Sequence, residues 1–217
     1  MTRYREIQWP WLGLFVAVAI VAQEHIGGWI GTQPKLTVNA WRIAVMALAL
    51  SSLTLLILPG RRAGFALGAI VCAALMGFAL YAQYGLGLEP CPLCVLQRIA
   101  VIACGVVCAL AAIHNPGRVG AIVYSVLGFV IAAAGATVST RHVWLQSLPP
   151  SEVPACGPGL NYMLETLPFA EVLSKVFLGS GECAAADWIF LGLSMPAWML
   201  VWFIAIMVAS IALIDRG

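Results

Sequence analysis

Four cysteines lie outside the most apolar stretches of this chain, and their spacing is compatible with thiol chemistry. Cys91 and Cys94 form a Cys-Pro-Leu-Cys pair, and Cys156 and Cys183 follow it, 27 positions apart from each other. A Cys-x-x-Cys pair is compatible with thiol–disulfide exchange, with a metal site or with a structural disulfide. A disulfide across so short a loop removes little chain entropy from the unfolded state, so a purely structural role is an inefficient use of the pair.

Arg98 favours the redox role for the first pair. It lies four residues after Cys94, one turn further along a helix that we predict from about residue 96. The positive end of that helix and a guanidinium that stays protonated both stabilise a thiolate at Cys94. The thiolate is the reactive form of cysteine, so the spacing predicts a reactive thiol here.

The second pair, Cys156 and Cys183, lies in "VPACGPG" and "GSGECAAADW", where glycine and proline allow the chain to bend. One interpretation is an ordinary loop disulfide, which would stabilise the fold by about 3 kcal/mol. The other is an exchangeable pair that passes oxidation to or from Cys91 and Cys94. Four thiols could also bind tetrahedral zinc, but the second pair lacks the short spacing of zinc knuckles, so we predict no metal.

The elements that must position these cysteines are membrane helices. The 217 residues are 62% hydrophobic and 9% charged, against about 25% charged in soluble domains, and the net charge of +2 gives no argument for nucleic acid. Stretches long enough to span a bilayer lie at residues 10–30, 42–58, 63–84, 96–114, 119–139 and 193–214. The first is the weakest, because Gln23, Glu24 and His25 interrupt it.

Arginines recur at every second boundary of these spans. They are Arg3, Arg5, Arg61, Arg62, Arg118 and Arg216, whereas Lys35, Arg42, Arg141 and Lys175 are exceptions on the other side. The positive-inside rule makes the arginine-rich boundaries and both termini cytoplasmic. The four chemically suited cysteines then lie on the outer side, where disulfides form and persist.

The long connection at 140–192 is too polar and too rich in proline to cross the membrane. Within it, residues 160–177 carry apolar side chains at helical spacing, which predicts a helix lying in the membrane interface. A loop packed on itself is the alternative.

The remaining cysteines, Cys72, Cys104 and Cys108, fall within apolar runs and are predicted to be core thiols. Trp144 and Trp198 are predicted to lie in the aromatic belt at the membrane interface.

Several of these stretches resemble the disulfide bond formation protein B family of bacterial inner membranes. They are "PCPLCVLQR" (90–98), "RHVWLQSLPP" (141–150), "ACGP" (155–158) and "GSGECAAADWIFLGLSMPAWML" (179–200), and the resemblance covers residues 63–214. It implies an all-α integral membrane fold, a four-helix transmembrane bundle whose long periplasmic loop carries an interfacial helix. The bundle would occupy residues 61–217. Residues 1–60 would add two further spans, which the family does not usually have.

The resemblance also implies an activity, that of a thiol:quinone oxidoreductase. The redox-active disulfides would be Cys91–Cys94 and Cys156–Cys183. A soluble periplasmic thioredoxin-like dithiol protein would attack Cys156, Cys183 would attack Cys91, and Cys94 would reduce ubiquinone or menaquinone. Arg98 and His142 match family positions near the quinone, whereas Gln97 stands where some relatives carry an acid. A metal-binding or redox-sensing protein with the same cysteines, and electron flow in reverse, remain alternatives.

Overall fold

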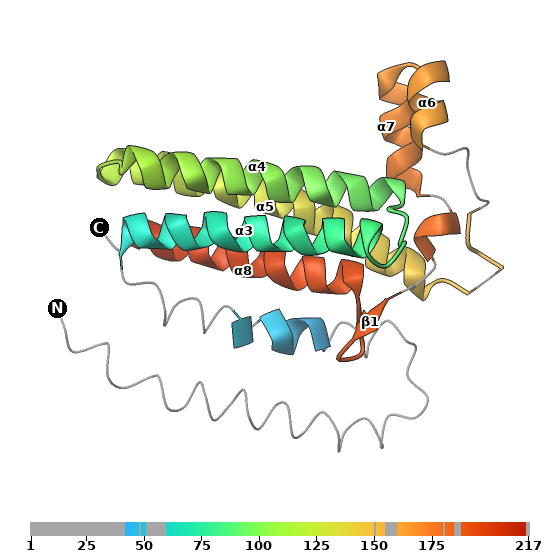
Figure 1. Cartoon of the computed structure of the whole chain (residues 1–217), viewed down its shortest axis with the longest axis horizontal. Coiled ribbons are helices and arrows are strands. Elements are labelled where there is room, and N and C mark those ends of the chain that lie inside the picture. The colour runs from blue at the N-terminus through green and yellow to red at the C-terminus, as the bar shows by residue number, and fades with distance from the viewer. Residues whose placement is uncertain are drawn as a thin grey trace.

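The computed structural model describes residues 42–47, 49–50, 60–149, 151–154, 160–179, 181–184 and 188–215. Its elements are α3 (Arg61–Tyr84), α4 (Pro92–His114), α5 (Arg118–Ser147), α6 (Leu160–Thr166), α7 (Phe169–Leu178), the 3-10 helix η1 (Gly181–Ala184), β1 (Ile189–Phe190), β2 (Leu193–Ser194) and α8 (Met195–Asp215). Residues 42–47 and 49–50 are also helical. The described part of the chain is therefore mostly helical (Figure 1).

Four of the described helices are long and apolar enough to cross a membrane, namely α3, α4, α5 and Met195–Ile214 of α8. They confirm the four later spans that hydropathy predicts. The expected span at 10–30 lies outside the described residues, and only 42–47 and 49–50 of the span expected at 42–58 lie within them. The two further spans of residues 1–60 therefore stay a prediction.

The four long helices lie side by side, with α3 on α4, α4 on α5, and α5 on α8 (Figure 1). At the centre, Cys72, Cys104 and Phe203 pack with Val101 and Ala132 in one buried cluster. This burial confirms Cys72 and Cys104 as core thiols, and Cys108 is partly buried in a neighbouring cluster.

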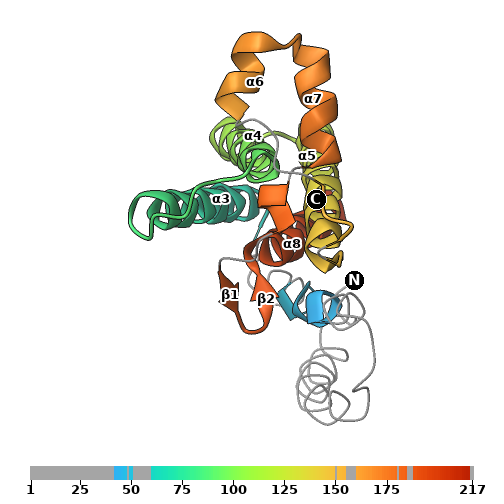
Figure 2. The ribbon, with the colours of Figure 1, turned by 90° about the vertical axis from the view of Figure 1, so that its right-hand side faces the viewer.

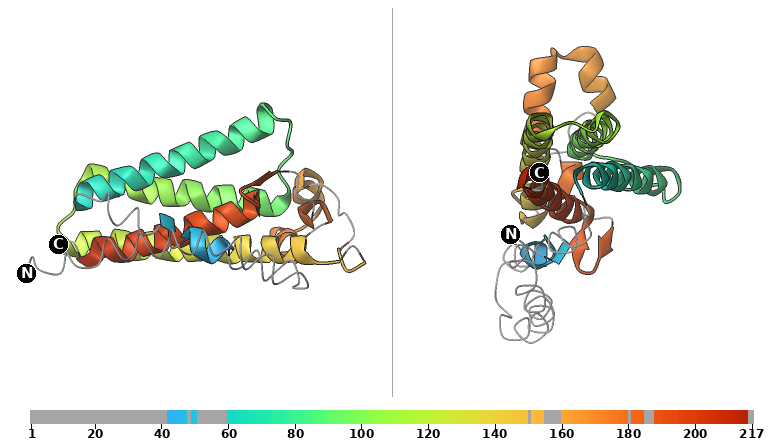
Figure 3. Two further views of the ribbon diagram at one scale, coloured as in Figure 1. Left: turned by 90° about the horizontal axis from the view of Figure 1, so that it is seen from below. Right: turned by 90° about the vertical axis from the view of Figure 1, so that its left-hand side faces the viewer.

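The two ends of the bundle differ in what they carry. The 85–91 connection, the paired strands β1 and β2, and helices α6 and α7 lie at one end, while the start of α3, the α4–α5 connection and the end of α8 lie at the other (Figure 1). Toward the loop-bearing end, α3 diverges from α8 (Figure 3). The cysteine-bearing segments therefore meet at the end where the bundle opens.

Two helix boundaries correct the expectation from hydropathy. Helix α4 begins at Pro92 instead of about residue 96, because proline is well suited to the first helical position, where its missing N–H is not needed. Helix α5 continues to Ser147 instead of ending near 139. The polar residues after 139 end the apolar run, but they do not end the helix, since no proline follows until Pro149.

The predicted helix at 160–177 is wrong as a single element, because the structure has two helices, α6 and α7, separated at Leu167 and Pro168. Pro168 has no N–H to continue α6 and precedes the first residue of α7. Both helices project beyond α4 and α5 (Figure 2). Met163, Val172 and Val176 are buried in one cluster with Leu93 and Leu145. The placement of these helices in a membrane interface stays a prediction.

Candidate functional site

The Cys-x-x-Cys pair lies at the start of α4. Cys91 is the residue that caps the helix, and Cys94 is in its first turn. Cys91 is 8% exposed, and its Sγ donates a hydrogen bond to Cys94 Sγ at 3.2 Å. The pair is thus present as two thiols in contact. Cys94 accepts this hydrogen bond and lies at a helix N-terminus, and both features favour a thiolate at Cys94.

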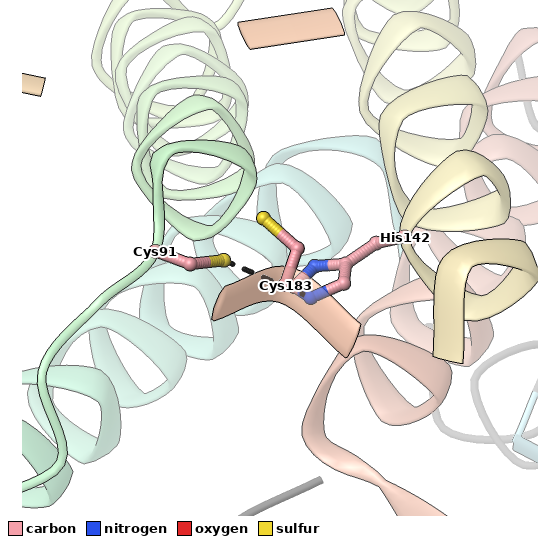
Figure 4. A group of neighbouring side chains, drawn as sticks. All are labelled: Cys91, His142 and Cys183. Carbon is pink, nitrogen blue, oxygen red and sulfur yellow. Dashed lines mark hydrogen bonds between the residues drawn. The ribbon is translucent and has the colours of Figure 1, made fainter. Parts of the chain in front are cut away.

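Cys183 reaches this pair from the far end of the long connection. It lies in η1, which packs against α5, and its side chain is fully buried. Cys91 Sγ, a ring nitrogen of His142 and Cys183 Sγ all lie within 4.8 Å of one another (Figure 4). We call these three residues the thiol–imidazole cluster. Cys156 lies outside the described residues, so its pairing with Cys183 stays a prediction.

Gly179 allows the chain to bring Cys183 so close. It follows α7 with φ of 82°, a conformation that favours glycine. A Cβ at this position would also overlap the Leu145 side chain of α5. A glycine at position 179 therefore allows the end of α7 to lie close to Leu145 of α5.

His142 comes from the part of α5 beyond the expected end of the span. It is 2% exposed, and its Nε2 lies 3.7 Å from Cys91 Sγ. Its Nδ1 lies 3.3 Å from the side-chain amide of Gln97, which is also buried. An amide can donate to Nδ1 or accept from it, so either neutral tautomer of His142 has a partner. His142 can therefore present Nε2 to Cys91 as a donor or as an acceptor.

Arg98 is held at the seam between α3 and α4. Its guanidinium donates to Gln83 Oε1 at 2.5 Å and to the Ala79 carbonyl at 3.1 Å. Both acceptors belong to α3, so this helix fixes the position of the cation. Arg98 lies one turn after Cys94 on α4, as the spacing predicts.

Cys91, Cys94, Arg98 and His142 all line one cavity of about 370 Å³. Its other walls come from α3, from α8, and from the segment that includes β1. They include Leu75, Met76, Phe78, Ala79, Val101, Trp188, Phe190, Trp198, Met199 and Trp202. The cavity is therefore mostly apolar. Its polar lining consists of the two thiols, Arg98, His142, the side-chain amides of Gln97 and Gln146, and the carboxylates of Glu89 and Glu182.

Four aromatic side chains form a continuous row along one wall of this cavity. Successive ring centroids are 5.5 Å apart from Phe78 to Trp188, 5.8 Å from Trp188 to Phe190, and 6.0 Å from Phe190 to Trp198. Trp198 Nε1 also donates to the Phe190 carbonyl at 3.0 Å. The row lines the same cavity as Cys94 and Arg98, and aromatic walls suit a planar ligand.

Comparison with known proteins decides the family. The family described as "Disulfide bond formation protein DsbB" matches residues 61–213. The chain belongs to this family. A "Disulfide bond formation protein B" from Chromobacterium violaceum is 55% identical over 155 residues, covering 71% of this chain and 93% of the relative. The relative of that name from Methylococcus capsulatus is 52% identical over 149 residues, covering 69% of this chain and 91% of the relative.

Membership in the disulfide bond formation protein B family confirms the resemblance noted in the sequence. With its four apolar helices, the chain is a multi-pass membrane protein. Its role is that of a disulfide-forming oxidoreductase that acts with a thiol–disulfide partner.

Sequence reasoning missed two features of this family member's site. One is Gln83, whose contact with Arg98 depends on how α3 faces α4. The other is the aromatic row, since Trp198 was expected only in the interfacial belt. The glycine of Leu191-Gly192 was a weak signal in the sequence for a tight turn beside these aromatic residues. In the structure the two residues have φ of 50° and 74° and connect Phe190 to its strand partner Leu193.

Proposed function

We propose that this chain is a thiol:quinone oxidoreductase that reoxidises a periplasmic thioredoxin-like dithiol protein and so sustains disulfide bond formation. The observation that carries the proposal is the shared cavity, where Cys94 and Arg98 meet an apolar, aromatic wall next to the thiol–imidazole cluster. The redox-active thiols of the proposal thus lie on the wall of a cavity that could hold a lipid-soluble electron acceptor.

The proposed exchange begins at the second pair. A thiolate of the partner attacks the Cys156–Cys183 disulfide at Cys156 and releases Cys183. Cys183 attacks Cys91, so a Cys183–Cys91 bond forms and Cys94 leaves as a thiolate. The partner's second thiol then closes the partner's disulfide and frees Cys156, which re-forms its bond with Cys183 and releases Cys91. The net result is one oxidised partner and one reduced Cys91–Cys94 pair.

The geometry supports the step between the two pairs. Cys183 Sγ and Cys91 Sγ lie within 4.8 Å of one another, and a ring nitrogen of His142 lies within 4.8 Å of both. Cys183 leaves its disulfide as a thiolate, which is the nucleophile, and a ring N–H of His142 can hydrogen-bond to it and keep it ionised. Cys94, at the helix N-terminus and one turn before Arg98, is suited to leave as a thiolate.

The residues around the cavity fit a membrane quinone, either ubiquinone or menaquinone. The volume of about 370 Å³ lies in the range of about 300–1,000 Å³ typical of ligand sites. A bound quinone supplies an acceptor for two electrons and two protons. Arg98 would bind a ring oxygen and stabilise negative charge there, and His142 would hold a proton at Nε2. The Cys91 and Cys94 thiols would supply the two electrons and two protons as the disulfide between them re-forms. Residues of both α3 and α8, such as Ala79 and Trp202, line the cavity, so a lipid-soluble ligand would enter it between these two membrane helices.

The proposed location is the bacterial inner membrane, with the cysteines facing the periplasm and both termini in the cytoplasm. Arg61, Arg62 and Arg118 begin α3 and α5, at the end of the bundle opposite the cysteines. Positive charge at membrane boundaries favours the cytoplasmic side. The opposite side is the oxidising compartment in which disulfides persist.

A coupled assay tests the activity. Purified protein in detergent receives a reduced thioredoxin-like dithiol protein and a short-chain quinone, and quinone reduction is followed by absorbance. We expect turnover that Cys94→Ser abolishes. Combined replacement of Cys72, Cys104 and Cys108 by serine is the matched control, and this variant should retain turnover. Absence of quinone reduction, or its survival in Cys94→Ser, would overturn the proposal.

A further inference from the structure

The thiol–imidazole cluster has the composition of a site for a thiophilic metal ion. Zn²⁺ prefers cysteine sulfur and histidine nitrogen in tetrahedral sets of four. Cys91, His142 and Cys183 supply three such ligand atoms, and Cys94 Sγ lies 3.2 Å from Cys91 Sγ. We propose that the fully reduced protein binds one Zn²⁺ or Cd²⁺ ion through Cys91, Cys94, Cys183 and His142.

The three atoms of the thiol–imidazole cluster require only small movements to close around an ion, and Cys94 Sγ, in contact with Cys91 Sγ, would turn toward it. Bonds of about 2.3 Å to sulfur and about 2.0 Å to nitrogen place tetrahedral ligand atoms roughly 3.5 Å apart. The distance between Cys91 Sγ and His142 Nε2 is already 3.7 Å, and no two of the three cluster atoms are more than 4.8 Å apart. The spacing of the Cys-x-x-Cys pair also lets both of its thiolates bind one ion.

The surroundings of His142 suit a metal ligand. A histidine that binds zinc usually donates its other ring N–H to an oxygen, which fixes the ring and its tautomer. The side-chain amide of Gln97 is 3.3 Å from His142 Nδ1 and can present its oxygen there. Binding through Nε2 would then leave Nδ1–H with a buried partner.

The charge of the site is also compatible with a divalent ion. Three thiolates and a neutral imidazole around Zn²⁺ carry one net negative charge. The same cavity is lined by the guanidinium of Arg98 and by the carboxylates of Glu89 and Glu182, so its lining has no excess of positive charge that would oppose a divalent ion.

Binding would depend on the oxidation state of the cysteines. The Cys91–Cys94 disulfide would remove two of the three thiolate ligands, and the proposed Cys156–Cys183 disulfide would remove the third, so the fully oxidised protein keeps only His142 from this set. A ligand that binds one state stabilises that state. The metal would therefore hold the enzyme reduced, and it would occupy three of the four sulfurs that the proposed electron path uses. This consequence rests on the proposed function, whereas the binding itself does not.

Cobalt titration tests the binding without quinone or partner. The full chain in detergent is reduced, freed of reductant without oxygen, and titrated with Co²⁺ as the spectroscopic probe. We expect one equivalent to give thiolate-to-Co²⁺ charge-transfer bands and tetrahedral d–d bands, which Zn²⁺ then abolishes. His142→Ala and Cys183→Ser should each lower the Co²⁺ affinity by about 10-fold or more. His142→Cys should restore tight binding, with bands shifted toward an all-sulfur site.

Three results would overturn the proposal. One is equal binding by the oxidised protein. Another is unchanged affinity and bands in both His142→Ala and Cys183→Ser, which would assign the ion to the Cys-x-x-Cys pair alone. The third is loss of binding when Cys72, Cys104 and Cys108 are replaced by serine, which would move the site into the helical core. Absence of quinone reduction in the coupled assay would leave the cobalt result unaffected, so the two proposals fail separately.

Discussion

The guanidinium of Arg98 on α4 donates a hydrogen bond to Gln83 Oε1 on α3, and the two atoms are 2.5 Å apart. A second hydrogen bond joins Arg98 to the Ala79 carbonyl of the same helix. The cation on the cavity wall is therefore oriented by the neighbouring helix as well as by its own. Its position should depend on a glutamine that does not itself line the cavity.

Gln83→Leu should weaken quinone binding without stopping chemistry. The substitution removes one acceptor and leaves Arg98 with the Ala79 carbonyl, so the guanidinium becomes mobile. A hydrogen bond to a charged group contributes about 1.5–3 kcal/mol, and we expect the KM for quinone to rise about 10-fold, with a smaller change in kcat. Tyr84→Phe is the control, since Tyr84 is 79% exposed and does not line the cavity. Equal effects of the two variants would argue against the orienting role.

Arg98→His should separate the two halves of the proposed reaction. Loss of a permanently charged guanidinium removes the group that stabilises negative charge on the acceptor, so the KM for quinone should rise by about 10-fold or more. Exchange of the partner at Cys156 should continue, because that step does not involve Arg98. Stopped-flow measurement of each half-reaction distinguishes them. Unchanged quinone kinetics would contradict the assigned role.

Gly135→Ala should destabilise the bundle. A Cβ at Gly135 would overlap the ring of Phe203, which is fully buried between α5 and α8. Overpacking of this kind costs about 1–3 kcal/mol, so we expect a lower melting temperature in detergent. Gly77→Ala in α3 is the matched control, because nothing lies within 4 Å of its Cβ position. It should be neutral or stabilise the helix by up to about 1 kcal/mol.

Gly179→Ala should slow electron transfer between the two cysteine pairs. The added methyl group meets both an unfavourable φ and the Leu145 side chain, so η1 and Cys183 should shift away from Cys91. Rapid alkylation and mass analysis would follow the appearance of reduced Cys91 and Cys94, and we expect a rate at least about 10-fold lower.

Two further variants separate the causes of the Gly179 effect. Gly87→Ala imposes a similar backbone cost, since Gly87 has φ of 69°, but nothing lies within 4 Å of its Cβ position. It should transfer electrons between the pairs faster than Gly179→Ala. Adding Leu145→Ala to Gly179→Ala opens space for the methyl group and should restore part of the rate. Failure of this rescue would show that the contact with Leu145 is not the cause.

Local features of the sequence were enough to predict the thiol chemistry and the membrane helices. Cysteine types, the spacing of Arg98 after Cys94 and the family motifs are local properties of the chain, and they predicted the redox residues directly. Hydropathy is likewise a local sum, and it found the four spans that the structure describes. It misplaced the start of α4 and the end of α5, because a helix ends where backbone hydrogen bonding is broken and not where the chain becomes polar.

Tertiary structure decided which of these residues meet. The contacts of His142 with Cys91 and Gln97, the hydrogen bond from Arg98 to Gln83 and the aromatic row each join elements that are distant in sequence. Such contacts depend on the rotation of each helix about its axis and on the path of the connecting loops. Both are set by packing at positions such as Gly135 and Gly179, where a single added carbon atom would change the distance between elements.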